Sequence, residues 1–151
     1  KQNLDVYARL YGVKEVKKRT EEMVEDLNLQ KFLNKKTGEL SSGQKNRVAL
    51  AKSLINKPKL LFLDEPTASL DPDVGDFVRK YIEDYKINNE LTILLASHNM
   101  SEVQRLCDDI IMMKEGKIVD RGTCDELIKK HGRENLEDTF LKIARSVNEF
   151  E

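Results

Sequence analysis

The sequence has no apolar run long enough to cross a membrane as a helix. Its longest apolar runs, such as Leu60 to Leu63 and Ile110 to Met113, hold four residues each, whereas a spanning helix needs about 18 or more. No signal-like apolar segment opens the chain. We therefore expect no direct membrane insertion, and any membrane role to run through a partner protein.

The chain also has few cysteines and almost no net charge. Cys107 and Cys124 are too few and too far apart for a disulfide framework or a zinc site, and are typical of reduced thiols. With 26 basic and 27 acidic residues the formal net charge is -1, which argues against a nucleic-acid binder that depends on bulk positive charge. The 151 residues, 39% of them apolar, suffice for one ordinary domain with a sizeable core.

Apolar residues recur at helical spacing in the first part of the chain. The spacing predicts a helix over Val13–Leu27, a shorter one before it around Leu4–Leu10, and another that begins near Ser41. The last of these must end before Pro58, because proline disfavours helix in the residue ahead of it. Residues 1–57 are therefore predicted to form an all-helical subdomain.

The spacing of the apolar residues changes after residue 57. Leu60–Leu63 is typical of a strand covered on both faces, and Thr92–Ala96 of a second one. Between them, Pro72–Tyr85 carries a helical apolar stripe. The sequence therefore predicts parallel strands, which belong to an α/β fold.

The remaining residues predict an antiparallel addition to that fold. A short helix runs through Val103 and Leu106, and the turn at Lys114–Lys117 joins two strands into a hairpin. Two more helices follow, near 125–130 and 136–147. We expect three parts: the helical subdomain over 1–57, an α/β core with an edge hairpin over 58–124, and C-terminal helices over 125–151.

Three polar stretches could carry chemistry, and each has a plainer alternative. Asp64 and Glu65 end the first strand, where one carboxylate could bind Mg²⁺ and the other orient a water; alone, the pair is more often an acidic turn. His98 follows the second strand and could contact a phosphate, or simply cap the next helix. Ser41, just before Gly43, could cap a helix whose N–H groups face an anion, or could cap it and nothing more.

Together these stretches are far more specific. The order LSSGQ, LLFLDEPTASLD and LLASHNM, followed by GKIVDRGTCDEL, resembles the ATP-binding subunits of ABC transporters across nearly the whole chain. The resemblance implies the Walker B half of a RecA-like P-loop NTPase core with an attached helical subdomain. That subdomain would end in the helix of the signature motif, usually written LSGGQ.

The resemblance also implies a role for each matching residue. Asp64 would lie at Mg²⁺, Glu65 would be the catalytic carboxylate, and His98 the switch histidine that senses the γ-phosphate. The signature residues would bind ATP held by a partner subunit, and Ser69 to Asp71 would form the D-loop at the interface of two subunits. The implied nucleotide-binding residues are Ser41, Ser42, Gly43, Gln44 and Asp71, and Arg47 matches the arginine that usually follows the signature.

The sequence departs from the family pattern in two places. Ser42 replaces the first glycine of the usual pair, which we expect to be tolerated because Ser41 and Gly43 are retained. More importantly, no G-x-x-x-x-G-K-[ST] phosphate loop is present; the nearest spacing, Gly38 to Gly43, continues with Gln44. The chain is therefore expected to be the C-terminal half of a nucleotide-binding domain, inactive by itself.

The implied function is the ATP-hydrolysing part of an ABC transporter, with ATP and Mg²⁺ as cofactors. The implied partners are a second ATP-binding subunit and a membrane-spanning permease, with a cytoplasmic location at the membrane. The runs YARLYGV and NLEDTFLKIARS resemble the exporter branch for drugs, polysaccharides or ions. Two alternatives stay open: a non-transport ATPase of the same superfamily that acts on ribosomes or in DNA repair, and an interaction module that never meets nucleotide.

Overall fold

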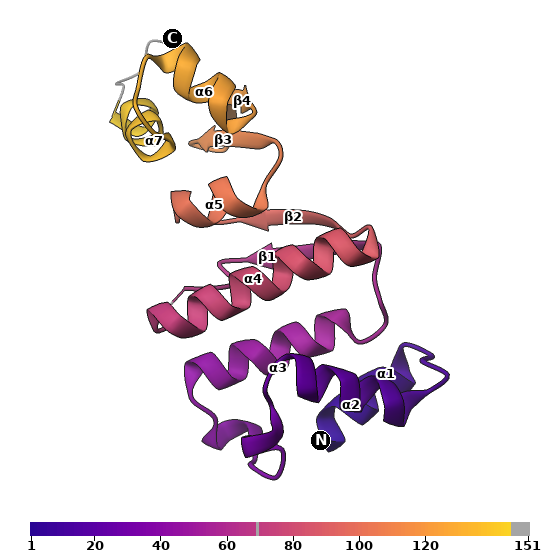
Figure 1. The fold of residues 1–151 in the computed structure, drawn as a ribbon. Helices are drawn as coiled ribbons and strands as arrows, with labels where there is room; N and C mark the ends of the chain where they lie inside the picture. The colour runs from indigo at the N-terminus through magenta and orange to yellow at the C-terminus, as the bar shows by residue number, and fades with distance from the viewer. Residues whose placement is uncertain (69, 146–151) are drawn as a thin grey trace. The chain divides into compact units, whose positions relative to one another are not determined.

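The computed structural model describes residues 1–68 and 70–145, which divide into two compact units, one up to Ala96 and one from Ser97 onward (Figure 1). It confirms the predicted α/β fold with parallel strands and an antiparallel hairpin. Within the described ranges, no helix combines the length and the apolar character that a membrane crossing requires. The predicted boundaries at 57 and 124 stay a prediction.

The first unit opens with three helices, α1 (Gln2–Leu10), α2 (Val16–Asp26) and α3 (Ser42–Leu54). Two short 3₁₀ turns, Gln30–Phe32 and Thr37–Glu39, connect α2 to α3. The α3 helix ends before Pro58, as predicted.

Helix α2 begins three residues later than predicted, because Val13 belongs to the end of α1. The Val13 N–H donates to the Ala8 carbonyl at 2.9 Å, and Gly12 adopts a φ of 68°. These are features of a glycine-terminated helix end, in which the chain turns away from the helix axis.

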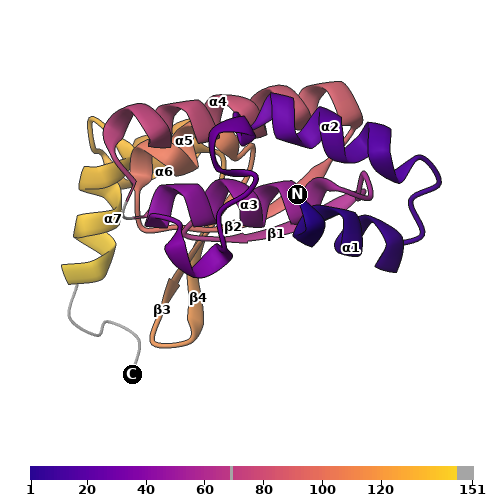
Figure 2. The same cartoon turned by 90° about the horizontal axis from the view of Figure 1, so that it is seen from below.

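Two parallel strands complete the first unit, β1 (Leu60–Asp64) and β2 (Thr92–Ala96), joined through α4 (Pro72–Asn89). Their register pairs Leu60 with Thr92 and Asp64 with Ala96. Helix α4 runs along one face of the two strands (Figures 1 and 2). Its Val78 and Ile82 side chains are buried.

The prediction that β1 is covered on both faces is wrong for the described residues. Leu61 is buried, but Leu60, Phe62 and Leu94 are 50%, 68% and 57% exposed. Successive side chains of a strand point to opposite faces, so covering by a helix on one side leaves every second residue in solvent. The result is an apolar sheet face formed by Leu60, Phe62 and Leu94.

A buried arginine ties the helices of the first unit together. Arg19 of α2 is 8% exposed, and its guanidinium donates to the carbonyls of Leu54 and Ile55 at 2.7 and 3.0 Å. It also donates to the Tyr85 hydroxyl of α4 at 3.2 Å and to Glu22 at 3.0 Å. The hydrogen bond from Arg19 lowers the pKa of the Glu22 carboxyl. One side chain thus caps α3 and joins α2 to α4.

The described part of the second unit contains three helices and the hairpin: α5 (Met100–Leu106), β3 (Ile110–Lys114), β4 (Lys117–Gly122), α6 (Cys124–His131) and α7 (Leu136–Arg145). Strand β3 pairs with β4 as an antiparallel sheet of its own. The predicted extension of the last helix to Val147 lies outside the described residues. The core is formed by Val103, Ile110, Met112, Leu127 and Leu136, with Cys107 and Cys124 packed against it.

A buried carboxylate links the hairpin to α6. Asp120 of β4 is 8% exposed and accepts from Lys130 Nζ at 2.7 Å and from the Arg121 N–H at 2.8 Å. Its other oxygen lies 2.5 Å from His131 Nε2. The hydrogen bond from Lys130, reinforced by that from His131, lowers the pKa of Asp120 to about 2.

We predict that Arg19→Ala lowers the free energy of unfolding by about 3 kcal/mol or more, because it leaves two buried carbonyls and a hydroxyl without their donor. Urea unfolding measures the change. The control is Lys18→Ala, which removes the neighbouring, 68% exposed charge and should stay within about 0.5 kcal/mol of wild type. Equal effects of the two substitutions would contradict the assigned role of Arg19.

We predict that the 151-residue chain self-associates through the apolar sheet face, because exposed apolar patches and unpaired strand edges favour contact with a second copy. Sedimentation velocity should show mass that rises with concentration, and Phe62→Asp should reduce it. Ile87→Asp, at an exposed position of α4, is the matched control. Wild-type chain that stays monomeric at high concentration would refute the prediction.

Asp120 makes the second unit sensitive to acid. Because the folded-state pKa of Asp120 is lowered to about 2 from an unfolded value near 4, its stabilising contribution is complete above about pH 4 and is lost toward pH 2. Asp120→Asn should therefore lower the free energy of unfolding at pH 7, and the difference from wild type should shrink between pH 4 and 2. A difference independent of pH would show that charge is not its cause.

Candidate functional site

The acidic end of β1 carries the first two predicted site residues. Asp64 is the last residue of the strand, pairs with Ala96 and is exposed. Glu65 lies just beyond the strand and donates its N–H to the Ala96 carbonyl at 2.9 Å. Its φ of 47° is left-handed, a conformation that costs a residue other than glycine about 1–3 kcal/mol. The turn, rather than strand alternation, therefore sets the direction of the Glu65 side chain.

The turn after Glu65 is held by a hydrogen bond of its own and by bonds from two helices. The Ala68 N–H donates to the Glu65 carbonyl at 3.1 Å, while Asn46 of α3 donates to the Pro66 carbonyl at 3.5 Å. From α4, Arg79 Nη1 donates to Thr67 Oγ1 at 3.3 Å. The surrounding helices thus restrain the strained residue.

Sequence reasoning did not single out Asn46 or Arg79. The one signal for Arg79 is Gly75, a glycine inside a strongly helical stretch and one turn before the arginine.

The predicted signature residues form the start of α3. Ser41 Oγ accepts from the Gln44 N–H at 3.3 Å, and Gln44 Oε1 accepts from the Ser41 N–H at 3.2 Å, which makes a reciprocal capping box. Ser41 therefore caps α3, and its binding of an anion stays a prediction. Capping by Ser41 is compatible with anion binding, because the same helix start presents its N–H groups and the positive end of its dipole.

The structure brings the signature residues next to the start of α4. A Cβ built on Gly43 would lie 3.5 Å from Val74 and 3.6 Å from Leu70, in ordinary contact. Asp71 is the N-cap residue of α4, but its exposed side chain makes no capping hydrogen bond. Ser69, also part of the predicted D-loop, lies outside the described residues.

Arg47 anchors α3 from the other side. Its guanidinium donates to the carbonyls of Leu27 and Asn28 at 3.5 and 3.4 Å and lies 5.2 Å from the centre of the Phe32 ring. Burial lowers the pKa of Arg47. The helix that carries the signature residues is therefore fixed both to the end of α2 and to the turn after β1.

His98 belongs to the second unit and is exposed, two residues after the end of β2. The alternative that His98 caps α5 is wrong, because Asn99 is the cap: its Oδ1 accepts from the N–H groups of Ser101 and Glu102 at 3.1 and 3.3 Å. The predicted position of His98 beside Asp64 stays a prediction.

Asp64 fits a magnesium ion that is bound together with a nucleotide, not one held by the protein alone. Among the described residues, no group of three or more His, Cys, Asp and Glu is placed to hold a metal. Mg²⁺ typically takes one or two protein carboxylates and completes its coordination with phosphate oxygens and water. The exposed carboxylate at the strand end matches that donor set.

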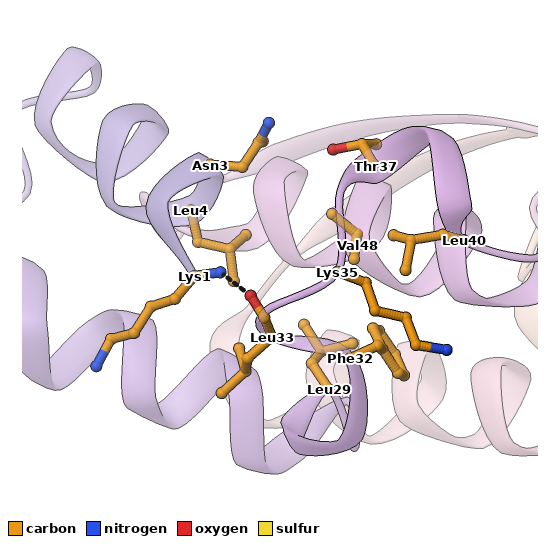
Figure 3. Close-up of a pocket in the computed structure, with 10 residues that line it drawn as sticks. All are labelled: Lys1, Asn3, Leu4, Leu29, Phe32, Leu33, Lys35, Thr37, Leu40 and Val48. Carbon is orange, nitrogen blue, oxygen red and sulfur yellow. Dashed lines mark hydrogen bonds between the residues drawn. The ribbon is translucent and has the colours of Figure 1, made fainter.

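Neither of two surface hollows of the first unit contains a predicted site residue. The hollow in Figure 3 has a volume of about 40 Å³, far too small for a nucleotide, and lies between α1, the 3₁₀ turns and α3. A wider one of about 310 Å³ is lined by the α1–α2 connection and the ends of α2 and α3. The candidate site is therefore an exposed surface, formed by the end of β1 and the starts of α3 and α4.

An α/β unit with two carboxylates at a strand end and a capped helix start offers groups suited to a metal and to a phosphate. Residues 1–68 match the sequence model of a family described as ABC transporter. The ABC transporter ATP-binding protein NatA of Bacillus subtilis is 35% identical over 98% of this chain and 61% of its own length. The methionine import ATP-binding protein MetN 3 of Shouchella clausii is 34% identical over 100% and 44%.

Solved structures agree. The ATP-binding subunit of an ABC transporter superposes with a TM-score of 0.79 at 23% identity, over 93% of this chain and 61% of that one. A bacterial ABC transporter cassette, solved as a dimer, has a TM-score of 0.66 at 27% identity over 74% and 48%. This chain is similar in sequence and in fold to the ATP-binding domains of ABC transporters. It spans 44–61% of the length of the two curated relatives above.

We predict that Ser41→Ala destabilises the first unit by about 1 kcal/mol, because it removes one half of the capping box. Thermal or urea unfolding measures the loss. Ser42→Gly, the control next to it, restores the usual family residue in the first turn and should change stability less. A larger effect of Ser42→Gly than of Ser41→Ala would show that the cap does not hold this helix start.

Proposed function

We propose that the protein containing this chain is the ATP-hydrolysing component of an ABC transporter. The observation that carries the proposal is the pair of carboxylates, Asp64 and Glu65, at the end of β1, where the parallel pairing with β2 ends. These carboxylates are suited to a metal and a water, and the start of α3 in the same unit is suited to the phosphate of a second nucleotide. The four ordered motifs support the same reading.

The proposed chemistry assigns one task to each residue. Asp64 would hold Mg²⁺, which when bound neutralises phosphate charge. Glu65 would accept a proton from the attacking water or orient it, an effect of about 10²- to 10⁴-fold in rate. His98 would donate a hydrogen bond to the γ-phosphate.

The signature residues would act on a second nucleotide. Ser41, Ser42, Gly43 and Gln44 would present the α3 N–H groups to ATP held by a partner subunit, and Asp71 would face that partner. Because the 151 residues contain no phosphate loop, we propose that this chain alone does not hydrolyse ATP.

The proposal includes a second ATP-binding subunit, a membrane-spanning permease and a cytoplasmic location at the membrane. Export is the proposed direction, on the resemblance of YARLYGV and NLEDTFLKIARS to the exporter branch. Of the relatives, MetN 3 is by name an import protein and TupC of Peptoclostridium acidaminophilum an uptake protein, so the direction rests on that resemblance alone. Transport by vesicles that contain the permease measures it.

We predict that Glu65→Gln in the full-length protein lowers the kcat of ATP hydrolysis by about 10²-fold or more, because the amide cannot accept a proton. ATP binding, measured by titration, should remain. The 151-residue chain alone should show no hydrolysis. Turnover by that chain, abolished by Glu65→Gln, would overturn the claim that it is incomplete; full-length protein without any ATP binding would overturn the proposed function.

A further inference from the structure

Thr67 lies two residues after Glu65 and is 8% exposed. Its Oγ1 accepts a hydrogen bond from Arg79 Nη1 of α4 at 3.3 Å. Its carbonyl accepts from the Leu70 N–H at 3.3 Å. Thr67 is thus a buried point of the turn that follows Glu65.

Gly75 explains how a guanidinium fits at this point. Gly75 is buried inside α4, one turn before Arg79, and the two residues share a helix face. A Cβ on Gly75 would lie 3.3 Å from Arg79 Nη1, 3.7 Å from Nη2 and 3.8 Å from Cζ, closer to Nη1 than most side chains allow. Glycine is among the poorest residues for a helix interior. The space that Gly75 leaves for the guanidinium accounts for its presence here.

The turn can transmit a displacement of Thr67 to Glu65. The Glu65 peptide is tied on both sides, through its N–H to Ala96 and through its carbonyl to Ala68. The φ of Glu65 is 47°, a value that a residue other than glycine keeps only under such restraints. The hydrogen bond from Arg79 is one of several restraints on this short segment, beside those from Asn46 and Leu70, and its loss lets the segment and the carboxylate shift.

We propose that Arg79 is a positioning residue for Glu65, that it acts through the hydroxyl of Thr67, and that Gly75 provides the space for its guanidinium. The inference rests on the proposed function, because Glu65 needs a reaction for its position to matter. The inference concerns the way in which α4 holds the turn. This role belongs neither to the strand end nor to the signature residues.

Steady-state ATP hydrolysis by the full-length protein tests the inference. Arg79→Ala and Thr67→Val, which removes the hydroxyl and keeps the shape, should each lower kcat about tenfold or more, as expected when a catalytic group is misplaced. The KM for ATP should stay within about twofold. The double substitution should be no worse than the single ones, because both remove the same bond, and Thr67→Ser, which keeps the hydroxyl, should recover most of kcat.

Gly75→Ala separates positioning from stability. Alanine favours the helix but brings its methyl group 3.3 Å from Arg79 Nη1, which shifts the guanidinium by a few tenths of an ångström; the melting temperature should not fall while kcat does. The matched control is Lys80→Ala, which alters the exposed neighbour of Arg79 and should leave kcat unchanged. If kcat falls only in variants whose melting temperature falls in proportion, or if Arg79→Ala and Thr67→Val add, the inference is wrong. If wild-type protein hydrolyses no ATP, the proposed function fails instead.

Discussion

The parallel pairing of β1 with β2 is the constraint on which the candidate site depends. It places Asp64 opposite Ala96 at the end of both strands, and the next hydrogen bond, from the Glu65 N–H to the Ala96 carbonyl, holds Glu65 in a left-handed conformation. A residue in that conformation turns the chain sharply out of the sheet. The pair of carboxylates therefore lies at the surface instead of continuing into a strand.

The helices around this strand end fulfil structural and chemical roles with the same atoms. Ser41 and Gln44 close a capping box that stabilises α3, and the same helix start offers its dipole to an anion. Asn46, further along α3, reaches the carbonyl of Pro66. A substitution of Ser41 or Gln44 therefore affects the stability of α3 as well as the N–H groups offered to an anion, and the two effects have to be measured separately.

Arg19 gives the first unit its helical framework. It replaces the missing hydrogen bonds at the end of α3 with donors from α2 and adds a bond to Tyr85 of α4. A buried guanidinium is stable only when its donors are used, and here they go to carbonyls and a hydroxyl as well as to Glu22. The position of α4, and with it that of Arg79, depends on this arrangement.

The sequence by itself determined the order of helices and strands, the α/β class and the ordered motifs, because apolar spacing and short-range hydrogen bonding depend on nearby residues. It failed where the partner atom is far along the chain. The exposed face at Phe62 depends on which side of β1 is covered, and the bond between Arg79 and Thr67 joins α4 to a turn twelve residues earlier. The cap of α5 is a further case. His98 and Asn99 are neighbours in the sequence, but only the side chain of Asn99 caps the N–H groups at the start of α5. Such choices depend on three-dimensional distance and burial, which only the tertiary structure supplies.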